Sequence, residues 1–146
     1  MFIFLRYPLE ENVRENEAED QRCLAKVEEI LEIQNKGPAP CVGLIVEPIQ
    51  SEGGDHHGSS AWFQGLQKLC AKYDIVYLMD EVQTGGGPTG KMWAHEYFDL
   101  DGSPDIVTFS KKMLTGGFYN KPELSPKHSY RVFNTWVGDP GETKIL

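Results

Sequence analysis

The chain has 146 residues, of which 40% are hydrophobic and 25% charged, so it suits one globular domain with an ordinary apolar core. Its formal net charge of −8 at pH 7 argues against nucleic-acid binding as the main role, because phosphate contacts need basic patches. No apolar run approaches the roughly 20 residues of a membrane-spanning helix, so we expect no membrane partner.

Neither a redox motif nor a targeting segment is expected. The three cysteines, Cys23, Cys41 and Cys70, form no CxxC pair, which argues against a zinc cluster. An odd count without framework spacing fits a reducing compartment. The opening residues 1–5 are apolar but too few for a signal peptide, so we find no targeting segment in this chain.

The first part of the chain predicts one helix after an extended lead-in. Because the residue before a proline avoids helical backbone, residues 7–11 are expected to be extended. From about residue 18 to residue 33, apolar side chains recur at helical spacing, and the many acidic residues there suit a solvated face. The glycine and prolines of residues 36–40 are expected to end this helix.

A strand, a helix and a second strand follow. Residues 41–46 are almost wholly apolar, which is typical of a strand buried on both faces. After a polar loop, Ser59 or Ser60 is expected to cap a helix whose apolar stripe extends to Tyr73. Residues 75–79 predict the next strand. This order within so few residues predicts parallel strands joined by a right-handed crossover.

Shorter elements are expected in the second half of the chain. Residues 92–98 suit a short helix and residues 106–109 a third strand, followed by a loop from residue 115 onward and an aromatic, extended segment at residues 130–138. The whole pattern predicts an α/β fold with a mostly parallel sheet and flanking helices.

Polar residues that could carry chemistry follow each predicted strand. Glu47 comes after the first strand, Asp80 and Gln83 after the second, and Lys111 and Lys112 after the third. In a parallel sheet these clusters would lie at one edge, where open α/β folds bind their ligands. We therefore expect Asp80 and one of the two lysines to hold opposite ends of one cofactor.

Each of these features has a simpler explanation when taken alone. Acidic residues such as Asp80 often end strands as turn formers, and adjacent lysines are usually a solvated pair. The glycines at residues 85–87 lack the spacing of the known nucleotide-binding loops. His56 and His57 belong to no spaced set of metal ligands, so a surface loop is favoured and no metal site is expected.

Four segments together resemble one enzyme family. They are VEPIQSEGG at 46–54, DEVQTG at 80–85, TFSKKM at 108–113 and FNTW at 133–136. DEVQTG is typical of class III aminotransferases, which are pyridoxal-phosphate-dependent enzymes of fold type I, and the other segments are similar to their 4-aminobutyrate branch. The resemblance, from about Tyr7 to Pro140, implies that residues 1–146 are a partial cofactor-binding large domain. The family's N-terminal part and C-terminal domain would be absent.

The resemblance assigns cofactor roles to residues at matching positions. Lys111 would form the Schiff base with pyridoxal 5'-phosphate and move the substrate proton, with Lys112 as the alternative because one of two possible spacings favours it. Asp80 would pair with the pyridine nitrogen, and Gln83 would lie near the phenolic oxygen. Thr135 would bind the cofactor phosphate of a neighbouring subunit.

The resemblance also implies a reaction and its setting. Glu52 would pair with a substrate-site arginine and release it for the dicarboxylic substrate, and Glu47 would lie at the edge of the site. The implied reaction moves the amino group of 4-aminobutyrate to 2-oxoglutarate, giving succinic semialdehyde and glutamate. A homodimer and the mitochondrial matrix are implied in the same way.

Two other interpretations stay open. The first is a catalytically inactive, truncated remnant with at most weak cofactor binding. Family residues that bind the phosphate, the cofactor ring and the substrate carboxylate have no counterpart here, so we expect the isolated chain to be weakly active or inactive. The second, more distant interpretation is a nucleotide-binding α/β domain.

Overall fold

A four-stranded sheet lies at the centre of residues 10–132, the part of the chain that the computed structural model describes, with side chains given from residue 12. Its order is β1-β4-β5-β6. The strands are β1 (Gly43–Val46), β4 (Val76–Asp80), β5 (Ile106–Phe109) and β6 (Gly117–Asn120). β1, β4 and β5 run parallel and β6 is antiparallel to β5, which confirms the predicted α/β fold with a mostly parallel sheet.

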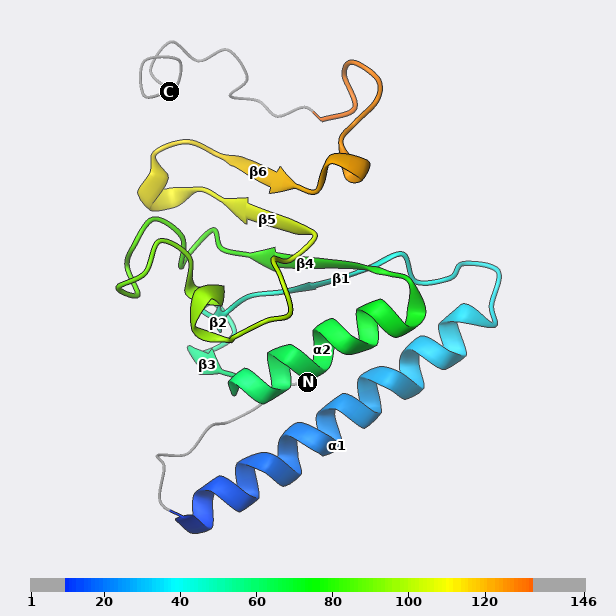
Figure 1. Cartoon of the computed structure of the whole chain (residues 1–146), viewed down its shortest axis with the longest axis vertical. Coiled ribbons are helices and arrows are strands. Elements are labelled where there is room, and N and C mark those ends of the chain that lie inside the picture. The colour runs from blue at the N-terminus through cyan, green and yellow to red at the C-terminus, as the bar shows by residue number, and fades with distance from the viewer. Residues whose placement is uncertain (1–9, 133–146) are drawn as a thin grey trace.

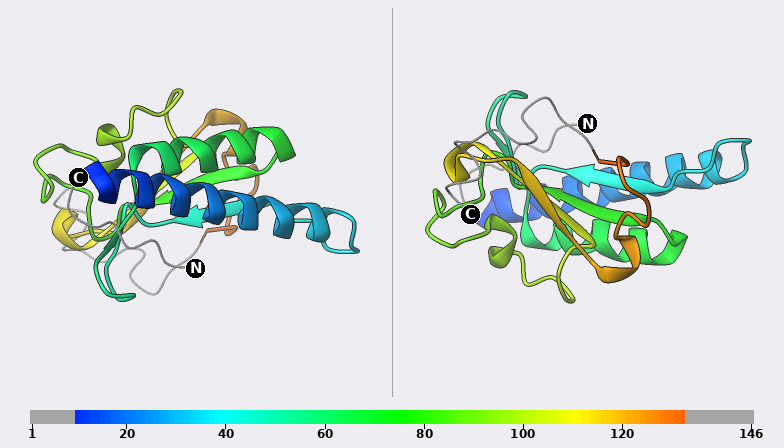
Figure 2. Two further views of the ribbon diagram at one scale, coloured as in Figure 1. Left: turned by 90° about the horizontal axis from the view of Figure 1, so that it is seen from below. Right: turned by 90° about the horizontal axis from the view of Figure 1, so that it is seen from above.

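Two long helices lie on the same side of this sheet (Figures 1 and 2). They are α1 (Glu10–Asn35) and α2 (Ser60–Tyr73), where α2 packs on β4 and α1 packs against α2. The shorter elements are β2 (Ile49–Gln50), β3 (His56–His57) and the 3-10 helices η1 (Ala94–Tyr97), η2 (Lys111–Met113) and η3 (Pro122–Leu124).

The core forms between α2 and β4, as the predicted strand–helix–strand unit requires. Helical spacing places Phe63, Leu66 and Cys70 on one buried face of α2. Strand alternation directs Tyr77 and Met79 toward that face, where both are almost fully buried. The parallel register of β1 against β4 follows from this crossover.

Two hairpins occur where the sequence predicted loops. β2 pairs with β3, and β6 pairs with β5 so that Gly117 lies opposite Phe109. A β-carbon on Gly117 would lie 2.7 Å from the Phe109 ring, so glycine allows the strand to pass close to this ring. The glycines before β6 had indicated only a turn, and for this reason the strand was missed.

Other predicted boundaries and environments were wrong. Glu10 and Glu11 are helical and not extended, because the run of good helix formers extends α1 upstream. β1 is not buried on both faces: Ile45 is 62% exposed, since within the described chain β1 pairs only with β4 and the helices cover one side. By contrast, the short helix predicted within residues 92–98 is present as the 3-10 helix η1. Tyr130 is in a turn with φ 62°, and residues 133–138 lie outside the described residues.

One buried acid links α1 to the start of α2. Asp20 is only 4% exposed, and its carboxylate accepts a hydrogen bond from the Ser59 hydroxyl. The same hydroxyl accepts a hydrogen bond of 3.0 Å from the Trp62 amide, so Ser59, and not Ser60, is the cap of α2 among the two predicted candidates. Burial raises the pKa of Asp20, and the hydrogen bond from Ser59 offsets this only in part.

We expect Ser59→Ala to lower the free energy of unfolding by about 1–2 kcal/mol, because it removes the cap and leaves Asp20 without a donor. Urea unfolding of the purified chain measures this change. Ser60→Ala is the matched control, since the Ser60 hydroxyl makes only an exposed bond to the Tyr97 carbonyl. Equal losses in both variants would contradict the assignment.

Candidate cofactor site

The carboxyl ends of the three parallel strands meet at one edge of the sheet. Val46 pairs with Met79, and Asp80 pairs with Thr108. Glu47 therefore lies level with Asp80, and Ser110 follows the end of β5, two residues after Thr108. The register confirms that the sheet is parallel at this edge and brings the polar strand ends together there.

Asp80 is held in a fixed orientation by the turn that follows it. Its side chain is half-buried, and Oδ1 accepts a hydrogen bond of 3.0 Å from the Val82 amide. Because Tyr77 and Met79 face α2, alternation places Asp80 on the opposite face of the sheet, beside Thr108. One carboxylate oxygen is thus bound to backbone before any ligand arrives.

Glu81 is the buried acid of this edge, and its role was missed in the sequence. Its side chain is fully buried, and its carboxylate accepts hydrogen bonds from the Ala94 amide (3.0 Å), the His95 amide (2.8 Å) and the Thr84 hydroxyl. His95 Nδ1 lies 2.8 Å from Oε1. Burial raises the pKa of Glu81, but these hydrogen bonds outweigh burial and hold the pKa below its ordinary value.

The two lysines begin η2, separated from the end of β5 by one residue, and both are exposed. Lys111 has φ 45°, in the left-handed region that residues with a β-carbon rarely adopt. This conformation distinguishes Lys111 from Lys112, and five other described residues share it: Asp55, Asp74, Asp99, Leu114 and Tyr130. A β-carbon on Gly86 would lie 3.1 Å from Met113 Sδ, so the glycine turn after Asp80 packs against η2.

A cavity of about 330 Å³ opens beside Asp80 and Glu47. Its other walls come from the end of β1, the β2–β3 hairpin and the start of α2: Ile45, Val46, Gln50, His56, His57, Gly58, Trp62 and Phe63. Glu47 also accepts a hydrogen bond of 3.3 Å from the Ser51 amide, which ties the hairpin to the strand end. The structure therefore brings Asp80 and Glu47 to one cavity.

The remaining predicted site residues do not line this cavity. Gln83 is half-buried in the loop after β4, and Glu52 is exposed at the tip of the β2–β3 hairpin. Lys111 and Lys112 lie on η2, across the glycine turn. Thr135 lies outside the described residues.

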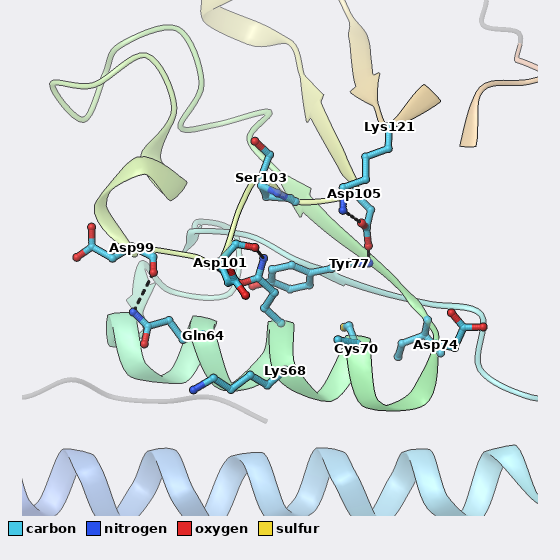
Figure 3. A pocket seen from close by; sticks show the side chains of 14 residues that line it. Gln64, Lys68, Cys70, Asp74, Tyr77, Asp99, Asp101, Ser103, Asp105 and Lys121 are labelled. Carbon is cyan, nitrogen blue, oxygen red and sulfur yellow. Dashed lines mark hydrogen bonds and ion pairs between the residues drawn. The ribbon is translucent and has the colours of Figure 1, made fainter. Parts of the chain in front are cut away.

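A larger cavity of about 400 Å³ lies between α2 and the loop before β5, away from Asp80 (Figure 3). Its polar side chains hold that loop in place. Gln64 donates to the Phe98 carbonyl (2.8 Å), and Gln67 accepts from the Asp101 amide (2.8 Å). Asp105 accepts from the Tyr77 amide (2.7 Å) and pairs with Lys121 (2.6 Å). These groups are engaged in packing the loop.

Neither a metal-ligand cluster nor a membrane-spanning helix occurs in the part of the chain that the structure describes. Between residues 10 and 132, no three His, Cys, Asp or Glu side chains are grouped so that they could hold a metal ion. Within the same residues, neither α1 nor any other helix combines the length and apolar character needed to cross a membrane.

Comparisons with known proteins agree on one family. The profile described as aminotransferase class-III matches residues 1–146. The chain is 53% identical over 145 residues to the mitochondrial 4-aminobutyrate aminotransferase of Sus scrofa, and 49% identical over 146 residues to the 4-aminobutyrate aminotransferase of Emericella nidulans. Each match covers 99% of this chain but only about 29% of the length of the relative.

A solved structure supports the same grouping. The lysine aminotransferase of M. tuberculosis matches 80% of this chain and 25% of its own, with a TM-score of 0.67 and 34% sequence identity.

We expect Glu81→Gln to lower the free energy of unfolding at pH 7 by about 1–3 kcal/mol. The glutamine NH2 group cannot accept the hydrogen bonds that one carboxylate oxygen accepts from buried donors such as the Ala94 and His95 amides. Since the folded-state pKa of Glu81 lies below its ordinary 4.5, its contribution is present above that pH and is lost as pH falls through the folded value. Urea unfolding from pH 7 to pH 3 measures the difference between wild type and variant.

The difference between the two proteins should therefore shrink in acid. The exposed residue Glu123, changed to glutamine, is the control and should show no such dependence. A difference that stays the same at pH 3 and pH 7 would contradict the stabilising role of the charged carboxylate.

Proposed function

Because the chain belongs to the class III aminotransferase family, we propose that residues 1–146 are part of the cofactor-binding large domain of a 4-aminobutyrate aminotransferase. The proposed reaction transfers the amino group of 4-aminobutyrate to 2-oxoglutarate, giving succinic semialdehyde and glutamate. The names of relatives that are 49–53% identical over nearly the whole chain support this substrate choice.

The observation that carries the proposal is the geometry of Asp80. Its Oδ1 is bound by the Val82 amide, and no other hydrogen bond to its carboxylate occurs among residues 12–132. Oδ2 can therefore accept a hydrogen bond from a protonated ring nitrogen. When bound, pyridoxal phosphate supplies an electron sink for the carbon that carries the substrate amino group. Asp80 would keep the ring nitrogen protonated, which strengthens that sink.

Lys111 would hold the other end of the cofactor through its ε-amino group and would move the substrate proton. Within the described chain this amine makes no ion pair, so it is available to a ligand. Its left-handed backbone conformation supports Lys111 over Lys112, because strain is retained where it serves a site. The contact of the glycine turn with η2 connects the lysine segment to the loop after Asp80.

Four further residues would complete the site. Gln83 would donate to the phenolic oxygen of the cofactor from the loop that follows Asp80. Glu52 would pair with a substrate-site arginine from its exposed position on the hairpin, and Glu47 would form the edge of the site. Thr135, outside the described residues, would bind the phosphate of a second subunit.

We also propose the setting that the relatives' names suggest. Amino acids and 2-oxo acids would be the substrates, and the active form would be a homodimer. The mitochondrial names of the mammalian and nematode relatives support a mitochondrial matrix location.

The purified chain mixed with pyridoxal phosphate should show a lysine-dependent shift of the cofactor absorbance band. Lys111→Ala should abolish the shifted band, whereas the neighbouring variant Lys112→Ala should keep it. The absence of a shifted band in the wild-type chain would favour the inactive remnant. Loss of the band only in Lys112→Ala would exchange the roles of the two lysines.

A further inference from the structure

We propose that Glu81 is a positioning residue for the cofactor: its buried carboxylate fixes the loop that carries Gln83 against both Asp80 and the lysine segment. This inference rests on the proposed function, because it concerns the same site. Because the Glu81 side chain is fully buried, it would act on the site through the groups that it binds.

Asp80 and Glu81 point to opposite faces at the end of β4. The Glu81 amide donates to the Thr108 carbonyl at 3.0 Å, which continues the pairing of β4 with β5 one residue past Asp80. Side chains of neighbouring residues on a strand point to opposite faces. Asp80 therefore faces the candidate cofactor region, while Glu81 turns inward to the loop.

The Glu81 carboxylate binds both ends of residues 82–95. Thr84 donates from the start of this segment, and Ala94 and His95 donate from its end. Backbone bonds add to the closure, because the Gly85 amide donates to the Glu81 carbonyl at 2.7 Å and the Gly86 amide donates to Met92 at 2.9 Å. The loop is consequently closed on the residue that follows Asp80.

Gly85 shows how tightly this loop is packed. A β-carbon there would lie 2.8 Å from the Glu81 carbonyl oxygen and 2.7 Å from the Trp93 ring. Trp93 in turn packs near Phe109, with ring centroids 6.1 Å apart, at the end of β5 where the lysine segment begins. Movement of this loop would therefore displace both predicted cofactor contacts, Asp80 and Lys111.

A charged acceptor is required for this arrangement. The two carboxylate oxygens of Glu81 are buried and accept hydrogen bonds from two backbone amides, one hydroxyl and one imidazole nitrogen. An amide side chain of the same shape presents only one acceptor oxygen, so some of these donors would lose their partner. Glu81→Gln should therefore release the loop without adding or removing side-chain volume.

The test measures the affinity of the folded chain for pyridoxal phosphate by absorbance titration, at a temperature where every variant is folded. We expect Glu81→Gln to raise the dissociation constant by about tenfold, the factor that corresponds to one poorly satisfied buried group. Leu31→Val is the control, because Leu31 is a buried core residue on α1, outside the site. It should lower stability while leaving affinity within about twofold.

Equal changes of affinity in both variants would reduce Glu81 to a residue needed only for folding and would overturn the proposal. Unchanged affinity in Glu81→Gln would overturn it as well.

Hydrogen exchange of the cofactor-free chain separates this inference from the proposed function. The Gly85 and Gly86 amides should exchange about tenfold faster in Glu81→Gln, while the Val76 amide, bound to the Val42 carbonyl, should be unchanged. If wild type binds no pyridoxal phosphate, the proposed function fails, and exchange still decides whether Glu81 holds the loop. Unchanged exchange at both glycines would overturn the positioning role.

Discussion

The arrangement of the candidate site depends on a carboxylate that stays charged away from water. Glu81 is fully buried, and burial alone would favour its neutral form. Donors from Thr84, Ala94 and His95 reverse that preference. The loop after β4 therefore supplies the donors that keep Glu81 charged, and the charge of Glu81 keeps the loop closed. Each requires the other, so the segment should be ordered as one unit.

The second constraint is the parallel register of the sheet. Residues that are distant in the sequence, Glu47 and Asp80, become neighbours because β1 and β4 run in the same direction with Val46 opposite Met79. The crossover helix α2 sets that direction, and its cap at Ser59 is tied to α1 through Asp20. Packing on one face of the sheet thus determines where the polar strand ends on the other face can meet.

The sequence allowed much of the frame to be predicted, because strong local patterns define it. β5 lies at the predicted residues, and Ser59 caps α2 as expected. β6 was missed because its glycine, Gly117, is equally compatible with a turn and with a strand that passes close to Phe109. The exposure of Ile45 on β1 was missed because an apolar run does not reveal how many neighbours a strand has.

The candidate site was predictable to a smaller degree. The meeting of Asp80 with Glu47 followed from strand order. The role of Glu81 could not be predicted from strand order, because the sequence does not show which of two adjacent acids has the buried side chain. The only visible signal was the strand alternation that buries Met79. The positive φ of Lys111 also has no signature in the sequence, since lysine is not a residue that usually adopts it.

In the proposed site, Asp80 would hold the protonated ring nitrogen of pyridoxal phosphate at this strand end. Nuclear magnetic resonance of cofactor labelled with nitrogen-15 in the ring can detect that proton. We expect a protonated-nitrogen chemical shift in the cofactor-loaded chain at neutral pH, and a neutral-nitrogen shift in Asp80→Asn. The same ring-nitrogen shift in both proteins would rule out this role of Asp80.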